Sequence, residues 1–295
     1  MNILKNIKSK LGNIRTRFRK NAKLRRIKQG ETISLDQLIT DFREAGLTEG
    51  DKVFVHSSLS KIGFVEGGAE TIINALKEVI TPKGTILFPA FCFPGGGVYD
   101  TIANEDYIFD VRTEPSYVGK ISEVFRHGED VVRSYHPTHS ITAWGKDAED
   151  YVREHVENGT WGAGTPFGKM LENNVTMIGL GVPLPMFTFF HCVEDYNLDL
   201  FPGLYTSDKL PVKIKIDNEI KTFHLAYHDP EFTKNRIEKD PEIAKYFTNF
   251  FLNSGKLEKV KIGNADSLLI TAQDFYDLTL TLAKKNCTIY KVNQE

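Results

Sequence analysis

The sequence is poor in cysteine and contains no long apolar run. Its three cysteines, Cys92, Cys192 and Cys287, are far apart and form no CxxC pair, which argues against a disulfide framework and suits a reducing cytosol. No stretch approaches the roughly 18 consecutive apolar residues of a membrane-spanning helix. Residues 1–28 lack the apolar core and small-residue cleavage site of a secretory signal. We therefore expect a cytoplasmic protein.

Several common site signatures are also missing. The glycine-rich segment WGAGTPFGKML, residues 161–171, has neither the GK[ST] ending of a P-loop nor the GxGxxG spacing of a dinucleotide site. His136 and His139 stand close together in RSYHPTHSITAWG, residues 133–145, but no HExxH signature or further ligand at metal spacing accompanies them. The sequence therefore predicts no metal site.

The charge is unevenly distributed along the chain. Eleven lysines and arginines precede Glu31, the first acidic residue, so 26 of the 37 basic residues remain to face 39 acidic ones. Apolar residues recur every three or four positions across residues 4–18, with basic residues on the other faces. Residues 1–30 are therefore expected to form a basic amphipathic arm on an acidic body.

Three uses of this arm remain open. Each basic residue near an anionic leaflet contributes about 1 kcal/mol, so residues 1–28 could hold the protein at the inner membrane face. The arm could instead pack on the body or contact another subunit, and the oligomeric state stays open. A nucleic-acid-binding arm is least favoured because the acidic body would repel phosphate, and we expect no nucleic-acid partner.

The remainder, residues 31–290, is expected to be a single α/β domain. Short strand-like runs at 52–59, 84–91 and 175–182 alternate with helix-like segments of ten or more residues. This alternation favours a largely parallel central sheet covered by helices.

The C-terminal part has a different pattern. Two alternating runs within residues 210–228 flank Asp217 and Asn218, which predicts an antiparallel hairpin. Helices are expected near residues 241–253 and 272–285.

One candidate for catalysis lies in MFTFFHCVEDY, residues 186–196. On a helix His191 and Glu194 share a face, so the carboxylate could accept the ring N–H and orient the imidazole as a base. The alternative is a hydrogen-bonded core histidine. Adjacent residues point about 100° apart on a helix, so Cys192 is poorly placed to pair with His191 and is expected in the core.

Three other segments could bind a ligand. Ser57, Ser58 and Leu59 follow a strand, where ligand sites of α/β sheets lie, although serines there also serve as helix caps. The loop from His136 to Ser140 could contact a ligand or serve structural hydrogen bonding. The third segment has glycines that suit a pyrophosphate or pantetheine chain, or simply a tight turn. These glycines are Gly162, Gly164 and Gly168.

Taken in order, these segments resemble the aminoglycoside 3-N-acetyltransferase family, also called the antibiotic N-acetyltransferase family. The resemblance runs from about residue 33 to 285 and rests on the order and spacing of its motifs. The matching stretches are VFVHSSLSKIGFVEGGAETIINALKEVITPKGTILFPAF, DVRTEPSYVGKISEVFR, VVRSYHPTHSITAWGKDAEDYVREH, GTPFGKML, IGLGV and FHCVED, with a weaker echo in VKIGNADSLLITAQDF.

The resemblance implies transfer of an acetyl group from acetyl-CoA to an amine on a sugar-like acceptor. By position His191 would be the general base and Glu194 its acidic companion. Family members of the aminoglycoside-modifying type carry an acidic residue after the hairpin, where His228 or Asp229 stands here. The residues expected on the CoA side are Ser57, Ser58, Leu59, His136, Ser140, Gly162, Gly164 and Gly168.

The difference from the aminoglycoside-modifying members after the hairpin, together with the basic arm, favours an amino sugar or glycan precursor as acceptor. We expect the acetyl group to pass directly from acetyl-CoA to this acceptor, without an acyl-enzyme. One alternative is an aminoglycoside 3-N-acetyltransferase that confers antibiotic resistance. Another, of a different class, is a CoA-binding or scaffolding protein without catalysis.

Overall fold

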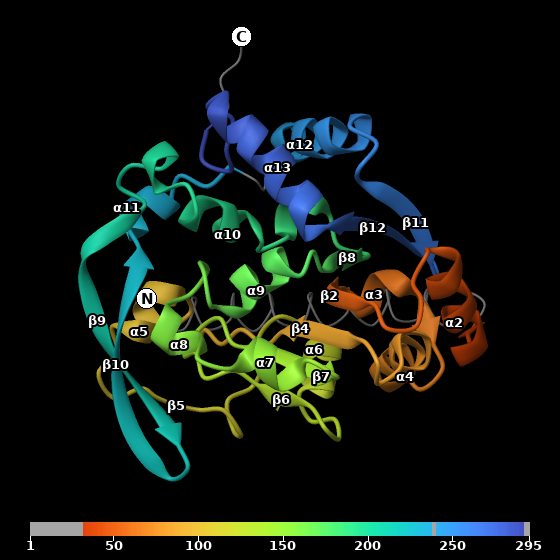
Figure 1. Ribbon diagram of the computed structural model, residues 1–295, viewed down its shortest axis with the longest axis horizontal. Helices are drawn as coiled ribbons and strands as arrows, with labels where there is room; N and C mark the ends of the chain where they lie inside the picture. Colours follow the sequence, from red (N-terminus) through yellow and green to blue (C-terminus); the bar gives the residue numbers. More distant parts are fainter. Residues whose placement is uncertain (1–31, 238–239, 292–295) are drawn as a thin grey trace, which may run out of the picture.

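The structure is a computed structural model and describes residues 32–237 and 240–291. Its centre is a seven-stranded sheet with the order β11–β12–β8–β2–β4–β7–β6 (Figure 1). The predicted arm of residues 1–30 lies outside the described residues. The strands of this sheet are β2 (Lys52–Ser57), β4 (Thr85–Pro89), β6 (Val132–Arg133), β7 (Ile141–Gly145), β8 (Thr176–Leu180), β11 (Glu258–Ile262) and β12 (Ala265–Thr271).

The α/β fold class is confirmed, but the sheet is only partly parallel. β8, β2 and β4 are parallel neighbours, whereas the other four pairings are antiparallel. Short connections explain two of these four antiparallel pairings, because parallel neighbours need a long crossover. β6 returns as β7 through residues 134–140, and β11 returns as β12 through Gly263 and Asn264.

Helices cover both faces of the sheet. Along β2, Val53 and Val55 pack in one core and Phe54 in the other, as the alternation of side chains in a strand requires. The first core includes α2 (Leu35–Glu44), α4 (Ala69–Ile80) and α6 (Lys120–Phe125). The second includes α7 (Ala148–Val152), α9 (Pro166–Glu172), α10 (Phe190–Asp195), α12 (Pro241–Asn253) and α13 (Ala272–Lys284).

The predicted hairpin is confirmed. β9 (Tyr205–Ile216) and β10 (Glu219–His228) pair antiparallel, and Asp217 and Asn218 turn the chain with φ of 48° and 69°. β9 also pairs with β5 (Ile108–Asp110), so a separate three-stranded sheet flanks the central one (Figure 1). The predicted C-terminal helices correspond to α12 and α13.

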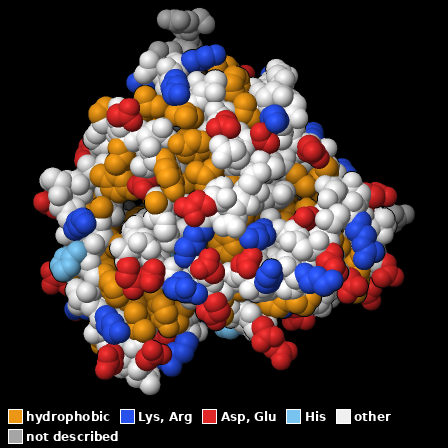
Figure 2. Space-filling model, viewed as in Figure 1, with side chains coloured by type: hydrophobic (Ala, Val, Ile, Leu, Met, Phe, Trp, Pro, Cys, Tyr) orange, Lys and Arg blue, Asp and Glu red, His pale blue; other side chains and the backbone are white. Residues whose placement is uncertain are grey.

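The remaining elements are short. They are β1 (Thr32–Ile33), β3 (Phe64–Val65), α3 (Leu59–Ile62), α5 (Val98–Ile102), α8 (His155–Asn158), α11 (Pro230–Thr233) and the 3₁₀ turns η1 (Leu184–Met186) and η2 (Leu198–Leu200). Among the helices of the described ranges, none is both long and apolar enough to cross a bilayer. Acidic and basic side chains are interspersed over the face of the molecule shown in Figure 2.

Candidate active site

The aromatic run before His191 fixes the position of α10. The rings of Phe187, Phe189 and Phe190 all pack against Phe275 of α13, with centroid distances of 6.0, 5.9 and 4.7 Å. Such aromatic pairs add to the hydrophobic burial of each ring. The run is therefore the anchor of α10, and it leaves the His191 side chain at the edge of a cavity.

His191 and Glu194 form a buried pair. The Nδ1 atom of His191 lies 2.7 Å from Oε2 of Glu194, and the Glu194 side chain is only 2% exposed. The hydroxyl of Tyr290 donates to the same Oε2 at 3.3 Å. Tyr290 is itself held by an edge-on contact with Phe232, at a ring-centroid distance of 4.7 Å. The carboxylate thus bridges the imidazole and a C-terminal tyrosine.

The environment keeps the imidazole neutral. Burial lowers the pKa of His191 well below its usual value, and the positive charge of Arg236 lowers it further. The contact with Glu194 places the ring proton on Nδ1, which leaves Nε2 as the atom able to accept a proton. A neutral imidazole with one free acceptor nitrogen is the form that a general base requires.

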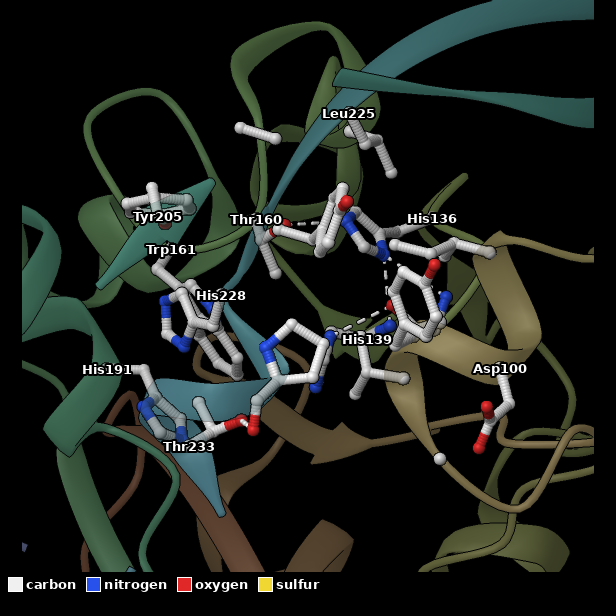
Figure 3. Close-up of a pocket in the computed structure, with 18 of the residues that line it drawn as sticks. Asp100, His136, His139, Thr160, Trp161, His191, Tyr205, Leu225, His228 and Thr233 are labelled. Atoms are coloured by element: carbon white, nitrogen blue, oxygen red, sulfur yellow. Dashed lines mark hydrogen bonds between the residues drawn. The ribbon is translucent and has the colours of Figure 1, made fainter. Parts of the chain in front are cut away.

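The cavity has a volume of about 320 Å³ and is lined by residues of the hairpin, of α5 and of the segments around His136 and Trp161 (Figure 3). The Trp161 ring stands between His139 and His191, with centroid distances of 4.5 and 4.8 Å. His228 faces His191 at 5.2 Å between ring centroids. Burial lowers the pKa of His139 well below its usual value, so the imidazoles present neutral nitrogen atoms to a ligand.

His228 reaches this position from the end of β10. The pairing register shifts between Ala226 and His228, so that His228 pairs with Tyr205. The hydroxyl of Tyr205 donates to Asp195 at 2.5 Å, which fixes the ring beside the imidazole. Burial lowers the pKa of His228 to about 3, and its buried Nε2 has no hydrogen-bond partner within the described part of the chain.

One cluster has the composition of a metal site. His191, Glu194 and His228 each offer a ligand atom, and these atoms lie within 4.8 Å of one another. Two histidines and a carboxylate are a set that zinc uses in proteins. Here Glu194 already accepts the ring N–H of His191.

The strand-end residues lie at the junction of β2 and α3. The Ser58 amide donates to the carbonyl of Leu180 at 2.9 Å, so it is not available to hold an oxyanion. The buried Oγ of Ser57 has no hydrogen-bond partner among the residues that the structure describes. His56 accepts from the amide of Thr188 at 3.3 Å, which ties the strand end to the segment before α10.

The predicted loop from His136 to Ser140 is internally hydrogen-bonded. Nδ1 of His136 accepts from the amides of Thr138 and His139, and its Nε2 lies 3.1 Å from the hydroxyl of Thr160. The Ser140 hydroxyl donates to a backbone carbonyl at 2.8 Å. His136 and His139 line the cavity, whereas Ser140 is fully buried beside it.

The three glycines permit close packing. A Cβ on Gly162 would lie 2.1 Å from a carboxylate oxygen of Asp195, and one on Gly168 would lie 2.4 Å from the Gly162 carbonyl oxygen. Gly164 has a φ of +76°. The cavity is lined by Thr160 and Trp161 just before this turn, not by the glycines themselves.

Asp229 does not line the cavity either. Its carboxylate caps α11 and accepts from the amides of Glu231 and Phe232 at 2.7 and 3.4 Å. Asp229 is therefore an N-cap residue of α11.

Sequence reasoning missed four residues of the site. Trp161 stands in a segment that was singled out for its glycines, and Tyr205 begins the hairpin strand. Arg236 and Tyr290 carry no local signal, because only the fold brings them to the histidines.

A comparison with models of known protein families shows which family the chain belongs to. The model of the aminoglycoside 3-N-acetyltransferase family matches residues 54–283. The chain belongs to this family. It is therefore an acyltransferase with acetyl-CoA as co-substrate. The buried Ser57 hydroxyl at the strand end, which has no partner within the described residues, fits a ligand on that side.

Two family members show how the similarity is spread. The prophage-derived aminoglycoside N(3')-acetyltransferase-like protein YokD of Bacillus subtilis is 33% identical over 168 residues, which are 52% of this chain and 62% of that protein. Aminoglycoside N(3)-acetyltransferase IX of Micromonospora chalcea is 25% identical over 264 residues, which are 85% of this chain and 93% of that protein.

Solved structures of family members share the fold. The crystal structure of aminoglycoside acetyltransferase AAC(3)-Xa matches with a TM-score of 0.75 at 23% identity and covers 92% of this chain and 99% of its own. The crystal structure of YokD from Bacillus subtilis matches with a TM-score of 0.70 at 24% identity. The match covers 87% of this chain and 93% of the YokD chain.

Proposed function

We propose that this chain transfers an acetyl group directly from acetyl-CoA to an amino group of an amino sugar or glycan precursor. The observation that carries the proposal is the 2.7 Å contact between His191 and Glu194 at the edge of a cavity. A neutral imidazole oriented by a buried carboxylate is suited to take the proton of an attacking amine.

The proposed reaction follows the acceptor nitrogen. The amine binds uncharged, Nε2 of His191 takes its proton as it attacks, and a bond forms to the thioester carbonyl carbon. The carbon–sulfur bond then breaks, and the leaving thiolate of CoA takes up the proton. General base catalysis of this type typically contributes 10²–10⁴-fold.

In this proposal acetyl-CoA binds at the carboxyl end of β2. The Ser57 hydroxyl offers a donor there, since its buried Oγ has no other partner within the described residues. Ligand sites of open α/β sheets lie beyond this end of the strands. His228, across the cavity from His191, would contact the acceptor through Nε2.

A second candidate acceptor is an aminoglycoside, which is itself built from amino sugars. The names of the family and of its member from Micromonospora chalcea favour this candidate, and with it a role in antibiotic resistance. The His191–Glu194 pair would act in the same way on both acceptors, so only a comparison of their kinetic constants can distinguish the two candidates.

The test is to incubate the protein with acetyl-CoA and a panel of amino sugars and aminoglycosides. Free CoA and N-acetylated product should form in equal amounts, and the acceptor with the highest kcat/KM names the class. Binding of CoA without turnover of any amine would favour a CoA-binding or scaffolding protein instead.

For residues 1–28 we propose contact with the inner membrane face, since their sequence combines an apolar stripe with basic residues. Deletion of these residues should abolish binding to anionic vesicles and leave acetyl transfer by the single domain of residues 31–290 intact. Unchanged vesicle binding after the deletion would contradict this role.

A further inference from the structure

The cavity is poor in negative charge. Among the described residues that line it, Asp100 has the one carboxylate, and it is exposed on α5, away from His191 (Figure 3). Glu194 and Asp195, which lie behind the wall, are engaged with His191, Tyr290 and Tyr205. A ligand in the cavity therefore meets few acidic groups near the proposed base.

This matters for a polyamine. An acceptor with four or five ammonium groups must pair each one that it buries, because an unpaired buried charge costs several kcal/mol. Sites that bind such molecules need carboxylates along the walls. Cation–π contacts with the aromatic rings found here contribute about 0.5–2 kcal/mol each, which is less than the cost of an unpaired buried charge.

Positive charge lies close to the base instead. Arg236 and Lys234 line the cavity together with Thr233. Thr233 lies at the end where His191 lies (Figure 3). The charge of Arg236 acts on His139, His191 and His228, since it lowers the pKa of all three. Lys234 contacts Glu231 at the surface. An anionic group near Arg236 would be stabilised by this charge.

The lining of the cavity also includes a pair of tyrosines. The rings of Tyr99 and Tyr227 lie 5.5 Å apart between centroids, and Tyr99 is 43% exposed. Faces of this kind offer apolar packing surface to a sugar ring.

We propose that the cavity selects an acceptor with a single amino group and a phosphate or carboxylate substituent, and that it discriminates against polyamines. The anionic substituent lies near Arg236 and Lys234, and the amine lies at His191. This inference rests on the proposed acetyl transfer and deepens it by naming the acceptor class.

The experiment compares three acceptors at saturating acetyl-CoA. They are glucosamine, glucosamine 6-phosphate and the polyamine kanamycin. The phosphorylated sugar should have a kcat/KM at least about tenfold above that of glucosamine, and kanamycin should have the lowest value. Calorimetric binding of the three to the CoA-loaded protein should give the same order, which provides a readout independent of turnover.

Arg236→Gln tests where the selectivity lies. The variant should reduce the preference for the phosphorylated sugar below about threefold, whereas Lys221→Gln, an equal change of charge on the exposed face of the hairpin, should preserve it. If Arg236→Gln instead raises the KM for acetyl-CoA and leaves the preference intact, the cation serves the CoA phosphates and the inference is overturned.

Other outcomes are equally decisive. Tighter binding or faster acetylation of kanamycin overturns the inference and leaves the acetyltransferase function standing. Failure of the phosphorylated sugar to bind also overturns it. If the wild-type protein does not bind acetyl-CoA, by contrast, the proposed function itself is contradicted.

Discussion

Glu194 follows His191 by one turn of α10, and its Oε2 accepts a hydrogen bond from Nδ1 of His191 at 2.7 Å. Both side chains are buried, and Glu194 is also contacted by Tyr290. The contact with Glu194 orients the imidazole, and burial keeps it neutral by lowering the pKa of His191. The contact with Tyr290 also makes the site dependent on the C-terminal segment, which lies beyond the residues matched by the family model.

Tyr290→Phe should lower kcat without changing the KM for acetyl-CoA. Loss of the hydroxyl removes one donor to the Glu194 carboxylate, and a hydrogen bond of this kind contributes about 1 kcal/mol, or roughly fivefold in rate. Steady-state kinetics measure the change. Tyr246→Phe, on the exposed face of α12, is the matched control.

A structural role alone would give a different result for Tyr290→Phe. The melting temperature would fall while the rate of the folded enzyme stayed at the wild-type value. The positioning role requires the reverse, a reduced kcat in a protein of nearly unchanged stability.

Cys192 should take no part in acetyl transfer. It is fully buried, and burial raises the pKa of its thiol far above neutrality, so the thiolate needed for attack does not form. Cys192→Ser changes one atom and should keep at least about a third of wild-type kcat in the folded protein. Mass spectrometry after incubation with acetyl-CoA alone should find no acetylated Cys192, and finding it would contradict direct transfer.

Stability should fall steeply as the pH drops below about 6.5. Burial lowers the pKa of six histidines in the folded state, so they bind protons only on unfolding, and acid favours the unfolded chain. Each contributes up to about 1.4 kcal/mol per pH unit between its folded pKa and its ordinary value near 6.5. The six are His56, His136, His139, His155, His191 and His228.

Chemical denaturation at several pH values measures this slope. His155→Gln should reduce it by about 1.4 kcal/mol per pH unit, whatever its effect on stability at neutral pH. A stability that stays level between pH 6.5 and 5 would mean that these imidazoles are already protonated in the folded protein.

Added zinc should inhibit the enzyme. The ion can take ligand atoms from His191, Glu194 and His228, and it would then occupy the lone pair that accepts the amine proton. We expect inhibition at micromolar zinc, reversed by a chelator, and no loss of activity on chelator treatment alone. His228→Gln should raise the inhibition constant at least tenfold, and His224→Gln, an exposed histidine of the same strand, should not.

The parts of the fold and site that the sequence could predict are local ones. The three-residue spacing of His191 and Glu194 defines a shared helical face, and the paired positive φ values of Asp217 and Asn218 follow from residue types that favour a hairpin turn. Helix and strand alternation likewise predicted the α/β class.

The missed features depend on contacts between distant segments. Tyr290 and Glu194 are 96 residues apart, and no local pattern links them. The direction of β7 depends on a seven-residue return through residues 134–140, which strand propensity alone does not reveal. The glycines around Gly162 were interpreted from the sequence as a turn that could bind a ligand. In the structure a side chain at Gly162 would collide with the Asp195 carboxylate.

The most direct test of the account is acetyl transfer by His191→Gln beside the wild-type protein, with acetyl-CoA affinity measured in both. Loss of the base should lower kcat by at least about 100-fold and leave acetyl-CoA binding within twofold. A variant that transfers acetyl groups at close to the wild-type rate would show that another group removes the proton, and the proposed role of His191 would be wrong.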